Sequence, residues 1–377
     1  MPWQEVSMMD QRREFAMFAS REGANVSALC RRYGISRQTG YKWLGRFACG
    51  EVDFADRPRR PLRQPKRTAR ALEAAVLAVR EAHSAWGARK IAWRLTQQGI
   101  TPPAVSTVHA ILRRHGCIEV GHGAPRPFRR FEKPAPNLLW QMDFKGRTRI
   151  AGGEAGGKWC HPFTMLDDHS RYALCLEACA NERTATVKPL LERTFRRYGL
   201  PGALYLDNGS PWGGGVPGQW TPLGVWLLKL GIEVIHSRPY HPQGRGKNER
   251  FHRTLKAEVL ALNCFRDLGQ VQQSFDEWRM VYNLERPHEG LEMTVPASRY
   301  RPSPRAMPET LPQVEYGPAD TVRRVGTTKA YVSFRGKAWK VPQAFRGERV
   351  AIRPRATDGH YAIFFGANRI ATIDLTT

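Results

Sequence analysis

The sequence predicts a multidomain protein with all-α N-terminal modules, a central α/β core and a small C-terminal β domain. The chain has 377 residues, enough for roughly two to four domains. Proline- and arginine-rich stretches lie near residues 56–65, 121–137 and 296–312, and proline ends helices and stiffens linkers. Between these stretches the apolar spacing changes from helical to mixed and then to alternating, which indicates a change of fold class along the chain.

We therefore expect five segments. They are a helix-turn-helix domain at 1–55, a second helix-turn-helix or winged-helix-like domain at 66–118, a basic proline-rich linker at 119–137, an α/β core at 138–295 and a β domain at 312–377.

The charge of the chain points to a polyanionic partner. The formal net charge is +25, and a basic folded protein most often binds nucleic acid. Residues 1–137 carry +14, residues 138–290 carry +4 and residues 291–377 carry +7. The nearly balanced middle suits a packed enzymatic core, and the basic flanks suit segments that contact phosphates.

Composition also excludes several classes of protein. With 41% hydrophobic residues the chain is not a disordered polyelectrolyte, and it has no apolar run of about 18 residues to span a membrane. No apolar signal region follows the N-terminus, and seven scattered cysteines suggest no disulfide framework. No phosphate-binding loop ending in Gly-Lys-Ser/Thr is present, so no nucleotide cofactor is expected. These features favour the reducing cytoplasm.

Residues 26–47 have a helix-turn-helix pattern. Gly34 can adopt the left-handed turn conformation, and Ser36 can cap a second helix. In that helix Trp43, Leu44 and Phe47 are expected to face inward. The outward side chains would be of the types that contact bases and phosphates; they are Arg37, Gln38, Lys42 and Arg46. The alternative is a helical hairpin with a solvated basic face.

Residues 69–116 predict a second helical unit. Its helices should span 69–83, 88–97 and 106–114, with Ser106 capping the last. Arg113 and Arg114 close that helix and are expected to contact DNA, although basic residues there also favour the helix dipole without DNA. Two modules on a basic linker would hold a longer site than one. The nearby His109, His115, Cys117 and His122 lack the paired spacing of a zinc site.

The middle segment predicts a sheet that carries acids. Strands are expected at 138–145, 157–166, 171–180, 203–206 and 232–236, a helix at 182–198, and a further helix from Gly246. Asp143 lies within an apolar strand, where an unpartnered acid is costly. Asp207 lies at the tip of a strand, a place typical of functional residues. Glu249 lies near the start of the last helix.

Three acids of this kind suit a divalent cation. Carboxylate oxygens are the ligands that Mg²⁺ or Mn²⁺ prefers, and two ions could clamp the attacking and leaving oxygens of a phosphodiester. Glu249, His252, Arg253 and Lys256 also share one helical face. This face would be a basic stripe along the DNA backbone, or a solvated surface with an intrahelical Glu249–Arg253 pair.

Four blocks of sequence resemble the catalytic blocks of the retroviral-integrase superfamily, and in particular bacterial insertion-sequence transposases with an Asp-Asp-Glu triad. The blocks are 140–143, 167–172, 206–210 and 240–256, in this order over about 115 residues. Residues 282–283 and 286–288, with Leu291 and Pro296, resemble the segment that follows the core in this family. The resemblance covers nearly the whole chain, including the helix-turn-helix end.

The resemblance implies an RNase H-like core with Asp143, Asp207 and Glu249 as catalytic and metal-binding residues. It implies two Mg²⁺ or Mn²⁺ ions and no other cofactor. Lys247, Arg253 and Lys256 would contact DNA near the active site. Asp167 and Asp168 do not match the triad and are interpreted as a turn and a salt-bridge pair. The 41 residues between Asp207 and Glu249 exceed the spacing in many relatives, so 211–220 is interpreted as a loop insertion.

The C-terminal segment predicts a small antiparallel sheet or barrel. Short alternating runs are broken by glycines, including Gly336, Gly347 and Gly359. Relatives often end in an SH3-like barrel that binds DNA or partner subunits. Basic side chains available for phosphates, or for an ordinary basic surface, are Lys337, Lys340, Arg349, Arg353 and Arg355.

Taken together, the sequence predicts a DNA transposase of an insertion sequence. It would bind terminal inverted repeats and, as a dimer or larger assembly on DNA, free a 3′-hydroxyl and join it to target DNA by metal-dependent phosphoryl transfer. It would act in the bacterial cytoplasm at the nucleoid. The alternatives are a domesticated, non-catalytic DNA-binding regulator and a structure-specific nuclease of the same fold.

Overall fold

A computed structural model describes residues 7–57, 68–118, 131–151, 158–213, 220–236 and 246–376. Most of the predicted linker, the centre of the predicted loop insertion and the first six residues of the 240–256 block lie outside these ranges. The chain divides into two compact units, Met1–Arg67 and Thr68–Thr377. No helix in the described ranges has the length and apolar character needed to span a bilayer.

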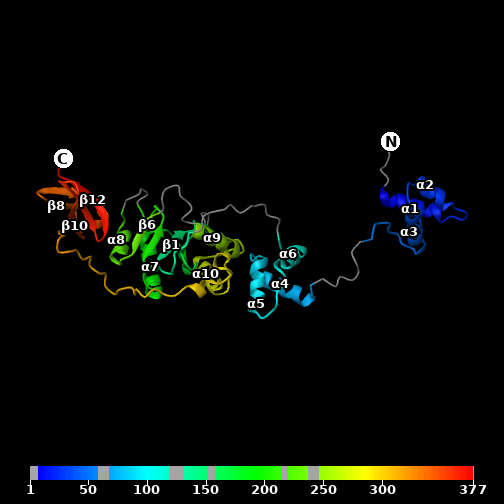
Figure 1. Ribbon diagram of the computed structural model, residues 1–377, viewed down its shortest axis with the longest axis horizontal. Helices are drawn as coiled ribbons and strands as arrows, with labels where there is room; N and C mark the ends of the chain where they lie inside the picture. The colour runs from blue at the N-terminus through cyan, green and yellow to red at the C-terminus, as the bar shows by residue number, and fades with distance from the viewer. Residues whose placement is uncertain are drawn as a thin grey trace. The chain divides into compact units, whose positions relative to one another are not determined.

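The first unit is a three-helix domain with the predicted turn (Figure 1). Its helices are α1 (Met8–Ala19), α2 (Val26–Arg32) and α3 (Arg37–Ala48). Gly34 has φ = 63° between α2 and α3, a backbone conformation that glycine adopts without strain. The Ser36 hydroxyl accepts a hydrogen bond from the Thr39 amide at 3.1 Å and caps α3 as predicted. Phe15, Trp43 and Phe54 are buried in the small core.

The second unit begins with another three-helix element. Its helices are α4 (Arg70–Ala82), α5 (Ala88–Gln97) and α6 (Val105–Arg114), and Trp86, Ile91 and Ile111 are buried among them. The predicted Ser106 cap is wrong, because α6 begins one residue earlier with Ala104 at its cap position and no side-chain hydrogen bond there.

The central sheet combines antiparallel and parallel pairs. Its strands are β1 (Leu139–Phe144), β2 (Thr148–Ile150), β3 (Lys158–Asp167), β4 (Ala173–Cys179), β5 (Ala203–Leu206) and β6 (Glu233–His236). Strands β4, β3 and β1 pair antiparallel, and β1, β5 and β6 pair parallel. Strand β2 pairs with the first residues of β3. In the parallel half, the carboxyl ends of β1, β5 and β6 lie next to one another.

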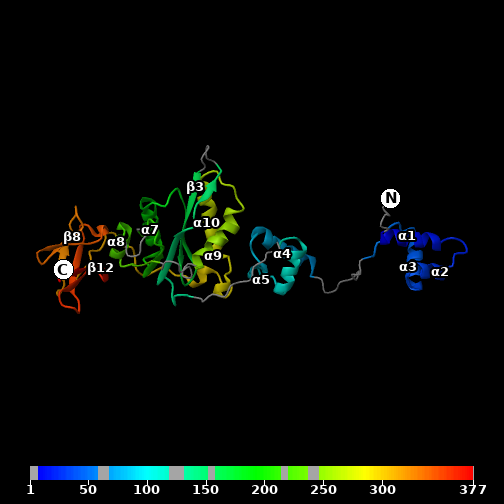
Figure 2. The ribbon, with the colours of Figure 1, turned by 90° about the horizontal axis from the view of Figure 1, so that it is seen from above.

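Helices cover both faces of this sheet, as Figure 2 shows for α7 on one side and α9 and α10 on the other. One face carries α7 (Thr184–Tyr198) and α8 (Pro222–Lys229). The other carries α9 (Gly246–Leu255), the π-helical turn η2 (Lys256–Leu260) and α10 (Leu268–Leu284). Short 3₁₀ turns follow at η3 (Glu289–Leu291) and η4 (Pro296–Arg299). The prediction of a central α/β core is confirmed.

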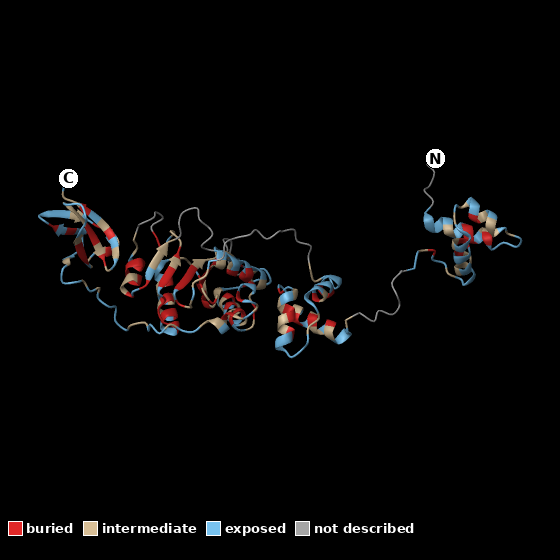
Figure 3. Ribbon diagram, in the orientation of Figure 1, coloured by how far each residue is buried: buried red, intermediate tan, exposed pale blue. Residues whose placement is uncertain are grey.

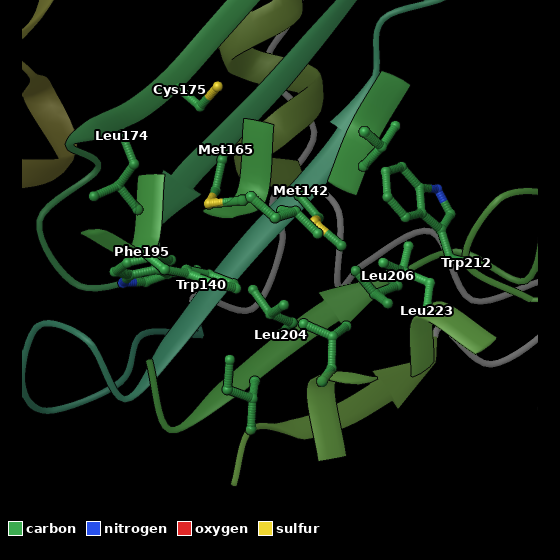
Figure 4. Packing of buried hydrophobic residues seen from close by; sticks show 14 of the residues in the cluster. Trp140, Met142, Met165, Leu174, Cys175, Phe195, Leu204, Leu206, Trp212 and Leu223 are labelled. Atoms are coloured by element: carbon green, nitrogen blue, oxygen red, sulfur yellow. The ribbon is translucent and has the colours of Figure 1, made fainter. Parts of the chain in front are cut away.

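Apolar side chains fill each layer. Figure 4 shows the layer beneath α7, where Trp140 and Met142 of β1 meet Phe195 of α7 and Leu204 of β5. On the opposite face Leu166 and Leu176 pack against Phe251, Phe275 and other residues of α9 and α10. Since successive strand residues point to opposite faces, the burial of Trp140 and Met142 directs Gln141 and Asp143 toward the α9 face.

The C-terminal part is made of β strands. They are β7 (Thr321–Arg324), β8 (Tyr331–Phe334), β9 (Lys337–Lys340), β10 (Arg349–Pro354), β11 (His360–Phe365) and β12 (Asn368–Asp374), with a 3₁₀ turn η5 (Gln343–Phe345). They form a four-stranded antiparallel sheet, β12-β11-β10-β7, and a β8-β9 hairpin. The predicted antiparallel sheet is confirmed. The SH3-like barrel is not, because the described strands form two separate sheets rather than a closed one. In Figure 3 these strands carry both buried and exposed residues, and Val332, Ile352 and Ile363 are among the buried ones.

Candidate active site

The parallel half of the sheet brings Asp143 and Asp207 to the same level. In the β1–β5 pairing Leu139 lies opposite Ala203 and Gln141 opposite Tyr205. Asp143 and Asp207 each follow two residues later, Asp143 within β1 and Asp207 directly after β5. Both are half-buried. The register therefore brings the backbone positions of Asp143 and Asp207 to the same level, at the carboxyl ends of β1 and β5.

Local hydrogen bonds shape the backbone around Asp207. Its Oδ1 accepts a hydrogen bond from the Gly209 amide at 3.0 Å, which tightens the turn after β5. Its main-chain oxygen lies 2.8 Å from His236 Nδ1. A carbonyl can only accept, so His236 carries its proton on Nδ1 and donates it. The ends of β5 and β6 are joined by this bond.

Glu249 comes from α9, which contacts the sheet beside Asp143. The Thr164 hydroxyl, opposite Asp143 in the β1–β3 register, donates to the Asp143 main-chain oxygen at 2.9 Å. His252 Nε2 lies 2.8 Å from the same hydroxyl. Since the hydroxyl has one proton and has donated it, His252 donates from Nε2. Glu249 is exposed one turn before His252, on the same face of the helix.

The donor set suits a divalent cation by its chemistry. Asp143, Asp207 and Glu249 offer only carboxylate oxygens, the ligands that Mg²⁺ and Mn²⁺ prefer. In the described part of the chain, no three acidic, histidine or cysteine side chains gather as a metal cluster. The chemistry of the three carboxylates thus fits a divalent cation, whereas their described arrangement does not form a closed cluster.

Lys247 is placed differently from the prediction that it contacts DNA. Its ammonium group forms an ion pair with the Asp168 carboxylate and donates to the Asp168 main-chain oxygen at 3.0 Å. Burial, and to a lesser extent the neighbouring Arg171, lower the pKa of Lys247 to about 8 against the opposing effect of Asp168. Lys247 is therefore directed into the protein.

Asp167 and Asp168 have separate structural roles. Asp167 accepts hydrogen bonds from the Asn137 amide at 2.7 Å and from the Ser170 amide and hydroxyl at 2.7 and 2.6 Å. Burial raises the pKa of Asp167, and these hydrogen bonds oppose the rise. Asp167 thus builds the turn after β3, and Asp168 forms the ion pair. The sequence predicts a turn and a salt bridge at Asp167 and Asp168, but it does not identify Lys247 as the partner of Asp168.

Three of the four predicted DNA-contacting residues of α3 lie on its surface. Arg37, Gln38 and Lys42 are exposed. Arg46 is not: its side chain is 12% exposed, pairs with Glu51 at 2.5 Å and donates to the main-chain oxygens of Asp53 and Ala55 at 2.9 Å each. Arg46 therefore holds the segment after α3 against the helix.

The other predicted contacts lie on the surface. Arg113 and Arg114 are both exposed, and Arg114 also pairs with Glu73 at 2.5 Å. Arg253 and Lys256 are exposed on α9 and η2. These residues are accessible to solvent, and their roles in DNA contact remain predictions.

The residues from 282 onward that resemble the segment after the family's core hold the end of α10 against neighbouring elements. The Asn283 side chain accepts from the Ala173 amide at 2.8 Å and donates to the Ala173 oxygen at 3.1 Å, which bonds α10 to β4. Arg286 pairs with Glu258 at 3.0 Å, and the Trp278 indole donates to the same carboxylate at 2.8 Å. These groups fix α10 against η2.

The predicted loop insertion is anchored at both described ends. Trp212 is buried and stacks on Phe144, with ring centroids 5.7 Å apart. Trp220 packs edge-on against Phe345 at 5.4 Å. Residues 214–219, between these anchors, lie outside the described ranges.

Family models match successive parts of the chain. They are an integrase core domain at residues 133–242 and again at 230–296, a C-terminal domain of IS481 family transposases at 320–377, a helix-turn-helix domain at 11–61 and a homeodomain-like domain at 39–112. The core at residues 133–296 is thus similar to integrase core domains.

The chain is also similar to individual proteins of bacterial insertion elements. The 39.2 kDa protein of insertion element IS476 from Xanthomonas euvesicatoria is 27% identical over 164 residues, 43% of this chain and 44% of that protein. The 31.7 kDa protein of insertion element IS407 from Burkholderia multivorans is 25% identical over 163 residues, 43% of this chain and 55% of that protein. The chain thus spans about half the length of these relatives. The resemblance to bacterial insertion-sequence transposases is confirmed.

Solved structures show a weaker likeness. A chain of the simian T-cell lymphotropic virus intasome in complex with a PP2A regulatory subunit is 16% identical, with 78% of this chain and 99% of that chain covered and a TM-score of 0.38. The HTLV-2 integrase catalytic core domain in complex with magnesium is 14% identical, with 44% and 97% covered and a TM-score of 0.33.

Proposed function

We propose that this protein is a DNA transposase of an insertion sequence that cleaves 3′ ends and transfers strands. The observation that carries the proposal is the level placement of Asp143 and Asp207 on adjacent parallel strands, beside the helix that carries Glu249. The resemblance to insertion-sequence proteins supports the substrate class.

In this proposal Asp143, Asp207 and Glu249 hold two Mg²⁺ or Mn²⁺ ions. Such ions would lower the pKa of an attacking water or hydroxyl and stabilise the leaving oxygen of a phosphodiester. The chain's own contribution is to hold Asp143 and Asp207 on paired strands and to present Glu249 from α9. Close carboxylates repel one another, so Glu249 is expected to join the two aspartates when a cation is present.

The basic surfaces would position DNA. Arg253 and Lys256 are exposed close to Glu249 in the sequence, and phosphate contacts from such residues fix the register of a duplex without specifying its sequence. Arg37, Gln38 and Lys42 of α3 would contact the terminal inverted repeats, with Arg113 of α6 adding a second contact. The same proposal includes the domain boundaries given above and a role of the C-terminal sheet as a binding module. It also includes assembly as a dimer or larger and action in the bacterial cytoplasm.

Strand transfer in vitro tests the proposal. Purified protein is mixed with labelled DNA ends taken from beside its own gene and a supercoiled target, with Mg²⁺ or with EDTA. We expect joined products that require Mg²⁺ and that disappear in Asp207→Ala.

Two other results would favour the alternatives. Binding of the ends without joining would favour a DNA-binding regulator, and cleavage without joining would favour a nuclease. The placement of Asp143 and Asp207 favours catalysis over the regulator, since a binding protein has no need of level carboxylates on adjacent strands.

A further inference from the structure

A buried ion pair lies next to the acid-bearing turn of α9. The Asp168 carboxylate is fully buried and the Lys247 side chain is 15% exposed. Besides Lys247, the two carboxylate oxygens of Asp168 accept from the Gln141 amide group and from the Lys133 main-chain amide, each at 2.8 Å. Asp168 therefore connects the chain before β1, strand β1 itself and the start of α9.

Within the described residues, the ion pair of Lys247 is with Asp168. Its ammonium lies 5.4 Å from the centre of the Phe131 ring. The charged groups around it include Arg171 and Glu132, which pair with each other at 2.7 Å. Arg299 lies 3.5 Å and His169 3.8 Å from Glu132. Both hydrogen bonds that the Lys247 ammonium donates to described residues go to Asp168, so a DNA phosphate would compete with Asp168 for this group.

Two polar contacts thus attach α9 to the sheet. Lys247 binds Asp168 at the start of the helix, and His252 binds Thr164 five residues later. At 3.6 residues per turn, these attachments lie about 140° apart around the helix axis. Contacts in two directions fix both the rotation and the axial position of a helix. Glu249 lies between Lys247 and His252 in the sequence, so the same two contacts fix the direction in which its side chain leaves the helix.

The pair has little to offer net stability. Burying two charges carries a desolvation cost that the attraction between them can fail to exceed. Such a pair is better suited to fixing one arrangement of the helix, and removal of one partner would leave the other charge buried.

We propose that the Lys247–Asp168 pair positions α9, and with it Glu249, against the strand that carries Asp143, and that Lys247 is a positioning residue rather than a DNA contact. The inference rests on the proposed function for its catalytic consequence. Its structural part is independent of that function.

Hydrogen exchange tests the structural part. The full chain is measured without DNA or Mg²⁺ as wild type, as Lys247→Met, which removes the charge and keeps the side-chain length, and as Arg253→Met. Arg253 lies exposed on the same helix and is the matched control. We expect exchange in residues 246–255 to be at least about tenfold faster in K247M and unchanged in R253M, because local opening limits exchange. Peptides from β4 and α7 serve as the internal reference.

DNA assays separate positioning from contact. K247M should bind the labelled ends within about twofold of wild type and lose about a hundredfold in strand-transfer turnover at saturating DNA, since misplacement of a reacting group by about 1 Å has this size of effect. R253M should show weakened binding instead. Lys247→Arg keeps the charge and should restore both exchange protection and most of the turnover.

Weakened DNA binding in K247M with unchanged exchange in 246–255 would overturn the proposal. If K247M fails to fold, Lys247→Gln, which keeps a hydrogen-bond donor, takes its place with the same expected directions and smaller changes. An inactive wild type would reject the proposed function alone, because the exchange comparison still decides whether the pair positions α9.

Discussion

Asp143 and Asp207 lie at the same level on two hydrogen-bonded parallel strands, each two residues beyond the Gln141–Tyr205 pair. The two residues are far apart in the sequence, and only the pairing of β1 with β5 brings them together. This relationship turns two ordinary carboxyl groups into one candidate site, and the first prediction concerns it.

Neutralising either carboxylate should stop catalysis without weakening DNA binding. Asp143→Asn and Asp207→Asn each remove one charged oxygen donor at nearly constant volume. We expect strand transfer to fall by at least about 10³-fold, the size of effect seen when one preorganised electrostatic group is lost, and end binding in gel shifts to stay within twofold. The control is Asp276→Asn, an exposed acid on α10, which should transfer strands normally. Transfer at wild-type rates in D143N would refute the site.

Substitution of Arg46 should lower the stability of the first unit, whereas substitution of Arg37 in the same helix should weaken DNA contact. Arg46→Ala removes the bonds to Glu51, Asp53 and Ala55, and we expect the first unit to lose about 1–3 kcal/mol in urea unfolding. Arg37→Ala should leave unfolding unchanged and reduce the salt dependence of DNA binding by about one phosphate contact. The opposite assignment of effects would show that α3 binds DNA through Arg46.

Breaking the Arg286–Glu258 pair should destabilise the core. Both side chains are under 10% exposed, and Glu258 also holds the Trp278 indole. Removing one partner leaves a buried charge, so Arg286→Met is expected to lower the free energy of unfolding of the second unit by about 3–5 kcal/mol. The exposed Arg266 provides the matched control, R266M, which should unfold as wild type does. Equal midpoints for the two variants would contradict the structural role of this segment.

The pKa of Lys247 predicts a pH dependence with a definite sign. Burial lowers it to about 8 from its ordinary 10.5, so between these pH values the unfolded chain binds more protons than the native one. Unfolding free energy from this group therefore rises with pH across that window. We expect urea unfolding of wild type between pH 7.5 and 10.5 to show this rise relative to K247M. A difference between the two proteins that falls with pH would contradict the buried position of Lys247.

Thiol reactivity should report the packing of the core. Cys49 and Cys264 are exposed, while burial raises the pKa of Cys160, Cys175 and Cys179 to about 12. Because the thiolate is the reactive form, a thiol reagent at pH 8 should label Cys49 and Cys264 first and the three buried thiols only after denaturation. A C49S/C264S variant should lose the fast phase. Fast labelling of Cys175 in the native protein would contradict its burial between β4 and α7.

Much of the fold could be predicted from local patterns. The helix at 88–97 and the strand at 203–206 are found at the predicted residues, since apolar periodicity reflects which face of an element is buried. The Ser36 cap was predictable because it is a local bond across three residues. The Ser106 cap was not, because α6 begins at Val105 and places Ser106 inside its first turn.

For the candidate site, too, some features could be predicted from the sequence and others could not. Residue type and order along the chain were enough to single out Asp143, Asp207 and Glu249 and to indicate an acid-based, metal-dependent chemistry. The directions of Lys247 and Arg46 could not be predicted, because a basic residue on a helix serves equally well as a phosphate contact or as the partner of a buried acid. That choice depends on which carboxylate the folded chain brings within reach. Tertiary packing brings Asp168 to Lys247, and the segment that follows α3 brings Glu51 to Arg46. Once one charge of such a pair is buried, the other stays with it, because an unpaired buried charge is costly.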